Sequence, residues 1–438
     1  MHRIHSGFTV AVAIKNGESG RLKALLKQLN KDESKSLVDF AGSETALFVS
    51  GVILPAQNYH GEMLPETFVL ATTFCGPFSR HLDDLLRTSK RGLCEIFRHC
   101  EGFPENGLAR DIDLAGYLRS HKYRSAFKSR YSGITKKDVQ EEKVLRRQIE
   151  TYLDKLRGLN VLDGLSPKSI KALIQRHIKT HATKFNCADR PARSANFQEI
   201  LSTWRVAVFL MVFEFFLFLV IALLVTYYIC FCTLFFIGFL LITMAVGFGF
   251  YIASKKSVTA SRPPDSHVRR ITATQLHPVI NEMTAAAPLK KGQLRKYFYA
   301  FALRVISIAG LIMDIPTVSS IRWLVVDKRR RLVFLSNYAN TTDFYVRDFL
   351  NGTTPKGINF MFSNGMGFPD AVFFYSGGVM TDPEGYMNVI HTHQHVTDLW
   401  YAHEQSLTVD NINKNRKIRD GLFKRMSDKE AKEWLRLF

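Results

Sequence analysis

Polar and apolar positions divide the chain into three parts. Between residues 206 and 253 apolar side chains follow one another with a single charge, Glu214. Such a run lacks the polar face of a helix on a protein surface. It is more than twice as long as the about 20 residues that one membrane span needs. The pattern therefore predicts a hairpin of two transmembrane helices over 206–253.

Basic residues flank this run on both sides, with Lys255 and Lys256 directly after it. Because positive flanks favour the cytoplasmic side, we expect an integral membrane protein with two spans and both soluble parts cytoplasmic. Glu214, Lys255 and Lys256 are the candidate membrane residues, since an acid inside a span is costly and basic residues attract headgroups. The expected partner is a lipid bilayer with anionic headgroups.

On either side of the run the sequence repeats itself. Thr9 and Thr284 lie 275 residues apart, Asp84 and Asp348 lie 264 apart, and Thr135 and Thr408 lie 273 apart. The matched blocks around these pairs occur in the same order, and their offset changes only between blocks. This is the pattern of a duplicated module.

Within each copy the pattern reads strand, helix, strand, strand, helix, strand. In the first copy apolar runs begin at residues 8, 45 and 67, and leucines at helical spacing follow residue 20. This order is that of the ferredoxin-like, split βαβ fold. The predicted class is α+β, two tandem ferredoxin-like modules separated by a two-helix transmembrane hairpin. The predicted boundaries are 1–160 for the first module, 161–205 for a basic amphipathic connector, 206–253 for the hairpin, 254–280 for a basic linker and 281–438 for the second module.

The repeated blocks "TTFCGPFSRHLDDLL" and "SNYANTTDFYVRDFL", with "HCEGFP" and "NGMGFP", resemble those of bacterial membrane-anchored proteins with two ferredoxin-like repeats. In that group the third strand ends in Asn-Tyr/Phe-Asp-Gly. Here Cys75-Gly76 and Ala339-Asn340 replace the pattern, so a role attached to its Asp would be lost. At fold level the blocks are similar to the dimeric α/β-barrel superfamily, which includes dye-decolourising peroxidases and small monooxygenases. The resemblance implies two sheets packed face to face, and haem as one cofactor to consider.

Charge and cysteine content narrow the range of possible functions and partners. The net charge of +20 predicts a polyanionic neighbour. Nucleic acid is not expected, because the third strands lack the aromatic pattern with which RNA-recognition modules stack bases. The six cysteines show no paired spacing and are interpreted as reduced. The chain has no phosphate loop, dinucleotide fingerprint or HExxH motif.

Histidines suggest one candidate metal site. His391, His393 and His395 fall close together, and imidazole is a common metal ligand. On a strand all three would share a face, whereas on a helix only the first and last would. The alternative is a solvated helix end. A haem would need a proximal ligand, and no histidine recurs in both copies.

Three functions remain open from sequence. The first is binding of a small apolar or lipid-like ligand at the membrane surface, in a groove between the two sheets. The second is a haem-dependent or cofactor-free oxidoreductase, and the third is a non-catalytic membrane scaffold. The sequence does not decide whether the chain is an enzyme. The predicted groove residues are aromatic or histidine side chains at strand ends, namely Phe74, Phe127, Tyr338, Trp400, Tyr401 and His403.

Overall fold

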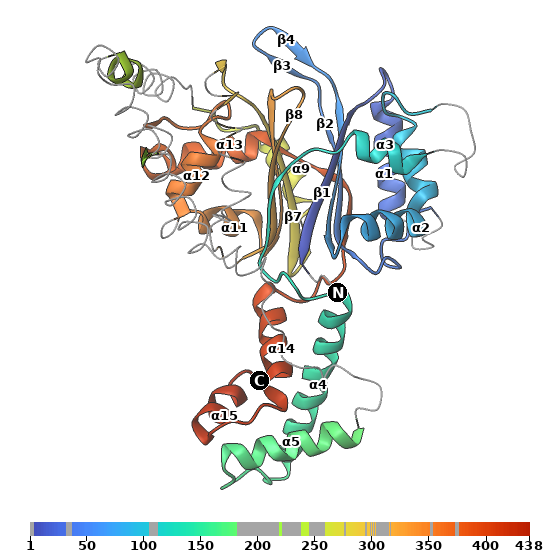
Figure 1. The fold of residues 1–438 in the computed structure, drawn as a ribbon, viewed down its shortest axis with the longest axis vertical. Helices are drawn as coiled ribbons and strands as arrows, with labels where there is room; N and C mark the ends of the chain where they lie inside the picture. The colour runs from blue at the N-terminus through green and yellow to red at the C-terminus, as the bar shows by residue number, and fades with distance from the viewer. Residues whose placement is uncertain are drawn as a thin grey trace.

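A computed structural model describes most of the two repeated parts (Figure 1). The described residues are 4–31, 37–104, 113–181, 219–220, 238–244, 259–275, 277–293, 296–297, 299, 301, 303, 315, 317–350, 354–372 and 376–438.

Two antiparallel sheets form the centre of the molecule. The first has the order β1-β5-β2-β13, with β1 at His5–Ala13, β5 at Thr67–Cys75, β2 at Ala46–Leu54 and β13 at Thr397–Ala402. The second has the order β12-β7-β9-β8-β6, with β12 at Gln394–His395, β7 at Ile280–Pro288, β9 at Arg331–Ala339, β8 at Val318–Val326 and β6 at Ala126–Ser129. In each sheet the three long strands come from one copy of the repeat.

Each copy lends its last strand to the other copy's sheet. In the first copy the chain touches β1 through a bridge between Val10 and Lys122, and then continues as β6, which pairs with β8. In the second copy β12 pairs with β7, and the chain then crosses as β13 to pair with β2. Neither sheet is therefore complete without the other half of the chain.

Helices cover the outer faces of the two sheets (Figure 1). On the first sheet these are α1 (Ser19–Lys31), α2 (Phe78–Phe97) and α3 (Leu114–Ser120). On the second they are α11 (Thr342–Asp348), α12 (Thr354–Phe362) and α13 (Pro383–His393). Each helix layer encloses its own apolar core against its sheet. The remaining short elements are β3 (Gln57–Tyr59), β4 (Glu62–Leu64), α9 (Asp265–Thr272), β10 (Ala371–Val372), β11 (Ser376–Gly377) and a 3-10 turn at Gly378–Met380.

The sheets pack face to face through side chains of both copies. One end of this interface is aliphatic, with Val52, Val69, Leu324 and Val333 fully buried. The opposite end is a second apolar cluster that includes Leu47 and Ile280. Polar side chains fill the middle, among them the buried Glu282 and Arg322.

A stalk of four helices extends from one end of the sandwich (Figure 1). It contains α4 (Lys136–Gly158), α5 (Pro167–His181), α14 (Val409–Leu422) and α15 (Asp428–Leu435). The repeat is visible in its caps, because Thr135 accepts a hydrogen bond from the backbone of Asp138 and Thr408 accepts one from Asn411. The predicted amphipathic connector contains α5, whose Ile174 and Ile178 pack in a core shared with α4, α14 and α15.

The predicted transmembrane hairpin is wrong as part of this fold. Among the described residues, no helix is both long enough and apolar enough to cross a membrane. Residues 206–253 lie outside the described residues except for 219–220 and 238–244, which are helical. The integral-membrane localisation and the membrane-based functions that depended on the hairpin are withdrawn with it. Glu214, Lys255 and Lys256 lie outside the described residues.

Candidate functional site

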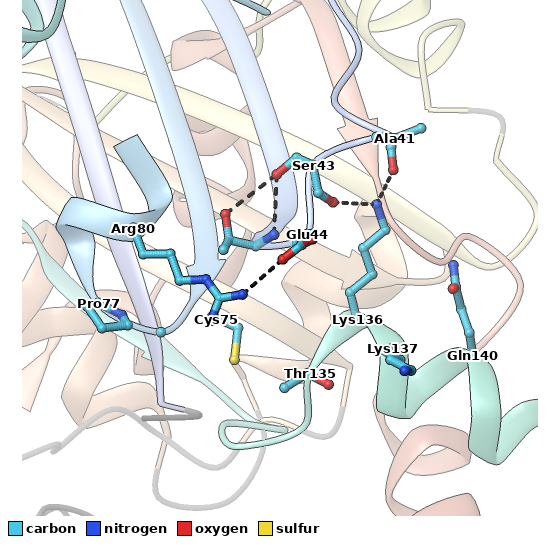
Figure 2. Close-up of a pocket in the computed structure, with 13 residues that line it drawn as sticks. Ala41, Ser43, Glu44, Cys75, Pro77, Arg80, Thr135, Lys136, Lys137 and Gln140 are labelled. Atoms are coloured by element: carbon cyan, nitrogen blue, oxygen red, sulfur yellow. Dashed lines mark hydrogen bonds and ion pairs between the residues drawn. The ribbon is translucent and has the colours of Figure 1, made fainter. Parts of the chain in front are cut away.

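A cleft of about 560 Å³ opens where the sandwich meets the stalk (Figure 2). Four structural features meet there: the segment leading into β2, the end of β5, the start of α2 and the start of α4. The lining residues are Ala41, Gly42, Ser43, Glu44, Thr45, Cys75, Gly76, Pro77, Arg80, Thr135, Lys136, Lys137 and Gln140. The volume is typical of a site for a small molecule.

Basic side chains dominate the charge of this cleft. Arg80 reaches Glu44 across the opening, with 2.9 Å between Nη2 and Oε2. Lys136 donates to the carbonyl oxygens of Ser43, at 2.9 Å, and Ala41. Lys137 is exposed and lies 3.7 Å from Glu141. The lining thus contains three basic side chains and a single carboxylate, Glu44, so its net charge favours an anion.

The two helices that begin at the cleft, α2 and α4, have different N-terminal caps. The first turn of α4 is closed by a capping box, in which Thr135 and Asp138 satisfy each other's backbone N–H groups. The first turn of α2 follows Pro77, whose side chain makes no capping hydrogen bond, and it contains no acidic residue. A helix start carries N–H groups without intrahelical partners and a partial positive charge. The start of α2 therefore adds to the positive potential of Arg80.

The second copy of the repeat provides an internal comparison. At the offsets of the matched blocks, Arg80 corresponds to Phe344, Lys136 to Val409 and Lys137 to Asp410. Pro77 corresponds to Thr341, which caps α11 by accepting from the backbone N–H of Phe344. None of these three cations therefore has a basic counterpart in the second copy.

Features behind the cleft are the same in both copies. Asp84 accepts a hydrogen bond from the Thr45 hydroxyl at 2.8 Å, and its counterpart Asp348 accepts one from Thr317 at 2.9 Å. Burial raises the pKa of Asp84, but hydrogen bonds from Ser43, Thr45 and Arg87 outweigh it and the net pKa lies below the ordinary value. This carboxylate fixes the start of β2 against α2. Because both copies keep it, its role is structural.

The predicted groove residues do not gather around one space. Phe74 and Tyr338 lie in the helix-facing cores, where Phe74 stacks on His81 and Tyr338 on Tyr345. Tyr401 also faces the helices, and packs against Phe40.

Phe127 and Trp400 do face the space between the sheets, and that space is filled. The ring of Phe127 lies 5.3 Å from the Arg322 guanidinium, and Trp400 Nε1 donates to Asn337 at 3.0 Å. His403 is buried at the stalk end of β13, where its Nδ1 lies 3.2 Å from the Leu47 carbonyl oxygen. Burial lowers the pKa of His403 to about 4.

The three clustered histidines have separate surroundings. His391 lies 3.3 Å from Asp343, His393 contacts the Met366 carbonyl oxygen at 3.1 Å, and His395 is on β12. Burial lowers the pKa of His395 to about 3. Within the described residues, no group of three or more His, Cys, Asp and Glu side chains could hold a metal ion.

The sequence matches no protein-family model, and neither a curated protein nor a solved structure is similar to it. The resemblance of the repeated blocks to the dimeric α/β-barrel superfamily therefore stays a prediction. The cleft residues were missed from sequence because they come from four separate segments. The available signal was the loss of charge between matched positions of the two copies, above all at Arg80 and Phe344.

Proposed function

We propose that this chain binds a small organic phosphate in the cleft between the sandwich and the stalk. The observation that supports it is the convergence of Arg80, Lys136, Lys137 and the start of α2 on one cavity, in one copy only. Guanidinium, ammonium and helix N–H groups are the donors that phosphate oxygens prefer.

The rest of the lining indicates what the phosphate is attached to. Its described residues include no aromatic ring, so a stacked nucleobase has no platform. Gln140 offers an exposed amide, which suits a body that carries hydroxyls, whereas the hydroxyls of Ser43, Thr45 and Thr135 already bond to Asp84 and Asp138. A sugar phosphate fits this chemistry better than a nucleotide.

The test is titration calorimetry of the purified chain with pyrophosphate, a hexose phosphate and acetate. We expect binding of both phosphates in preference to acetate. Arg80→Phe and Lys136→Val place in the first copy the residues that the second copy carries at Phe344 and Val409. Each substitution should weaken phosphate binding at least tenfold, since a hydrogen bond to a charged group contributes about 1.5–3 kcal/mol.

Two further variants separate recognition from general charge. Arg91→Ala removes the same charge from an exposed position on α2 outside the cleft lining, and should leave the affinity within about twofold. Glu44→Gln frees Arg80 from its ion pair and should tighten binding. Binding that survives Arg80→Phe unchanged, or no binding of either phosphate, contradicts the proposal.

A further inference from the structure

The copies also differ in charge in the layer between the sheets. Glu282 on β7 corresponds to Gly7 at the offset of the first matched block. Arg322 on β8 corresponds to Ser50, because Arg322 pairs with Leu335 and Ser50 pairs with Ala71, the residue matched to Leu335. Glu282 is 7% exposed and Arg322 is 4% exposed. Both charged side chains therefore lie in the interior between the sheets, and both belong to the second copy.

Glu282 connects β7 to the strand that leaves its sheet. One carboxylate oxygen accepts from the Thr284 hydroxyl at 2.6 Å, and the other accepts from the hydroxyl of Thr397. Thr397 is the first residue of β13, directly after the chain crosses from the second sheet to the first. The carboxyl thus lies at the crossing point of the exchanged strand.

Arg322 extends in the opposite direction, from the second sheet into the first. Its guanidinium donates to the carbonyl oxygens of Phe8 and Thr72 at 3.1 and 3.0 Å, and to the hydroxyls of Thr9 and Thr73. These oxygens belong to β1 and β5. Arg322 is solvated by peptide and hydroxyl groups there, and its charge lowers the pKa of Glu282.

Burial affects the pKa of Glu282 more than the charge of Arg322 does, and raises this pKa to about 7. The hydrogen bonds from Thr284 and Thr397 and the charge of Arg322 oppose it. The carboxyl therefore changes its charge within the physiological range.

Four further titratable groups lie on or next to the strands that surround Glu282. Burial lowers the pKa of His395 on β12 to about 3, and lowers the pKa of His277 before β7. Burial raises the pKa of Tyr338 on β9. Asp398 follows Thr397 on β13, and burial raises its pKa while Lys23, Lys27 and Arg270 oppose that rise.

β13 also reaches the cleft. Tyr401, four residues after Thr397, packs on Phe40, and the Lys136 ammonium lies 5.6 Å from the centre of its ring. Lys136 lines the cleft. A movement of β13 would therefore change the surroundings of a phosphate-binding lysine.

We propose that Glu282 is a proton-operated latch, a contact that holds β13 in place or releases it. The latch is closed when the carboxyl is neutral and is loosened when the carboxyl ionises. Loosening of β13 weakens anion binding in the cleft through Tyr401 and Lys136. The second half of this inference rests on the proposed function. A buried neutral carboxyl exchanges hydrogen bonds with the two threonines at little cost, whereas a buried carboxylate favours any opening that lets water reach it.

Amide hydrogen exchange on the full chain tests the latch. After correction for intrinsic exchange, protection of the β13 amides should fall on the order of tenfold between pH 6 and pH 8.5, because opening is linked to loss of one proton. Amides of β5, in the centre of the same sheet, should keep their protection. An equal loss in β5 would mean global unfolding and would overturn the latch.

Three variants test whether the pH dependence of exchange in β13 comes from Glu282. Glu282→Gln should remove the pH dependence at β13, and Thr397→Val should raise β13 exchange already at pH 6. Glu66→Gln makes the same chemical change at a position with partial solvent access and should behave as the wild type. A wild-type pH dependence in Glu282→Gln overturns the inference.

Sulfate titrations separate the latch from the cleft, since sulfate does not change its charge in this range. The wild type should bind sulfate more tightly at pH 6 than at pH 8.5, and Glu282→Gln should bind equally at both. If sulfate does not bind at either pH, the proposed function and the coupling fail together while hydrogen exchange still decides the latch. Equal wild-type affinities at both pH values, with a loosened β13, overturn the coupling alone.

Discussion

His81 should make the first module sensitive to acid, and the repeat itself supplies the substitution that removes this sensitivity. The imidazole is fully buried on α2 and stacks on Phe74, with 4.1 Å between ring centres. Its Nδ1 lies 2.9 Å from the Thr45 hydroxyl, which donates its own proton to Asp84. Nδ1 therefore carries the hydrogen, and Nε2 accepts from Thr72 at 2.8 Å.

This neutral tautomer uses both ring nitrogens, so protonation in the folded state is unfavourable. Burial lowers the pKa of His81 to about 3, although Asp84 opposes the shift. The unfolded chain takes up the proton near pH 6.5, so stability from this group is complete above that pH and is lost as the pH falls toward 3. Between pH 7 and pH 5 the loss is about 2 kcal/mol.

The second copy has Tyr345 at the matched position. Its ring stacks on Tyr338 with 4.1 Å between centres, and its hydroxyl donates to Ser336 at 2.7 Å, the counterpart of Thr72. His81→Tyr should therefore keep the stack and the hydrogen bond while removing the titration.

The assay is urea unfolding at pH 7 and pH 5, compared between the wild type and His81→Tyr. Their difference in unfolding free energy should change by about 2 kcal/mol in favour of the variant at pH 5. The contributions of other titrating groups to the free energy of unfolding are the same in both proteins, so they cancel in this difference. A difference that is the same at both pH values would refute the assigned protonation state.

Two further predictions concern the backbone. Thr135→Ala and Thr408→Ala should each lower the free energy of unfolding by about 1 kcal/mol, measured by urea titration, because each removes a helix cap at the root of the stalk. An effect confined to one of them would mean that the matched caps are not equivalent. Gly92→Ala should cost about 1–3 kcal/mol, because its Cβ would lie 2.7 Å from the Leu37 carbonyl oxygen, whereas Gly20→Ala on α1 meets no atom within 4 Å and should be neutral or stabilising. Equal thermal midpoints for these two glycine variants would contradict the packing at Gly92.

The repeat could be found from sequence because structural contacts preserve spacing. Thr135 and Thr408 begin equivalent helices, and Asp84 and Asp348 hold equivalent strand starts. A cap or a buried carboxylate works only at a fixed distance from its partner, so insertions accumulate between such blocks rather than within them. Constant offsets therefore predicted which positions are equivalent in the two halves.

The exchange of the last strands could not be found in this way. β6 and β13 are short, and an alternating pattern indicates a strand without naming the strand beside it. The alternating pattern also did not indicate which face of its strand each predicted groove residue occupies. Phe74 and Tyr338 are matched aromatic residues, but they lie on the helix-facing side of their strands, whereas Phe127 and Trp400 face the other sheet.

The hairpin prediction rested on the length of the apolar run, its lack of a polar face and its basic flanks, and none of these shows where helices begin and end. The hairpin interpretation explains much of the +20 charge by attraction to lipid headgroups. Arg80, Lys136 and Lys137 in the cleft are a separate use for part of this charge.

Differences between the copies are informative once the structure shows which of them converge. A duplicated chain must keep residues that fold both halves, and it is free to change residues that serve one half only. Phe344 is 53% exposed, so the position matched to Arg80 accepts an apolar ring without a buried partner. The fold therefore does not require a cation there. Arg80 on α2 and the two lysines at the start of α4, Lys136 and Lys137, meet at one cavity, and this convergence supports the proposal that their charge serves the binding of an anion.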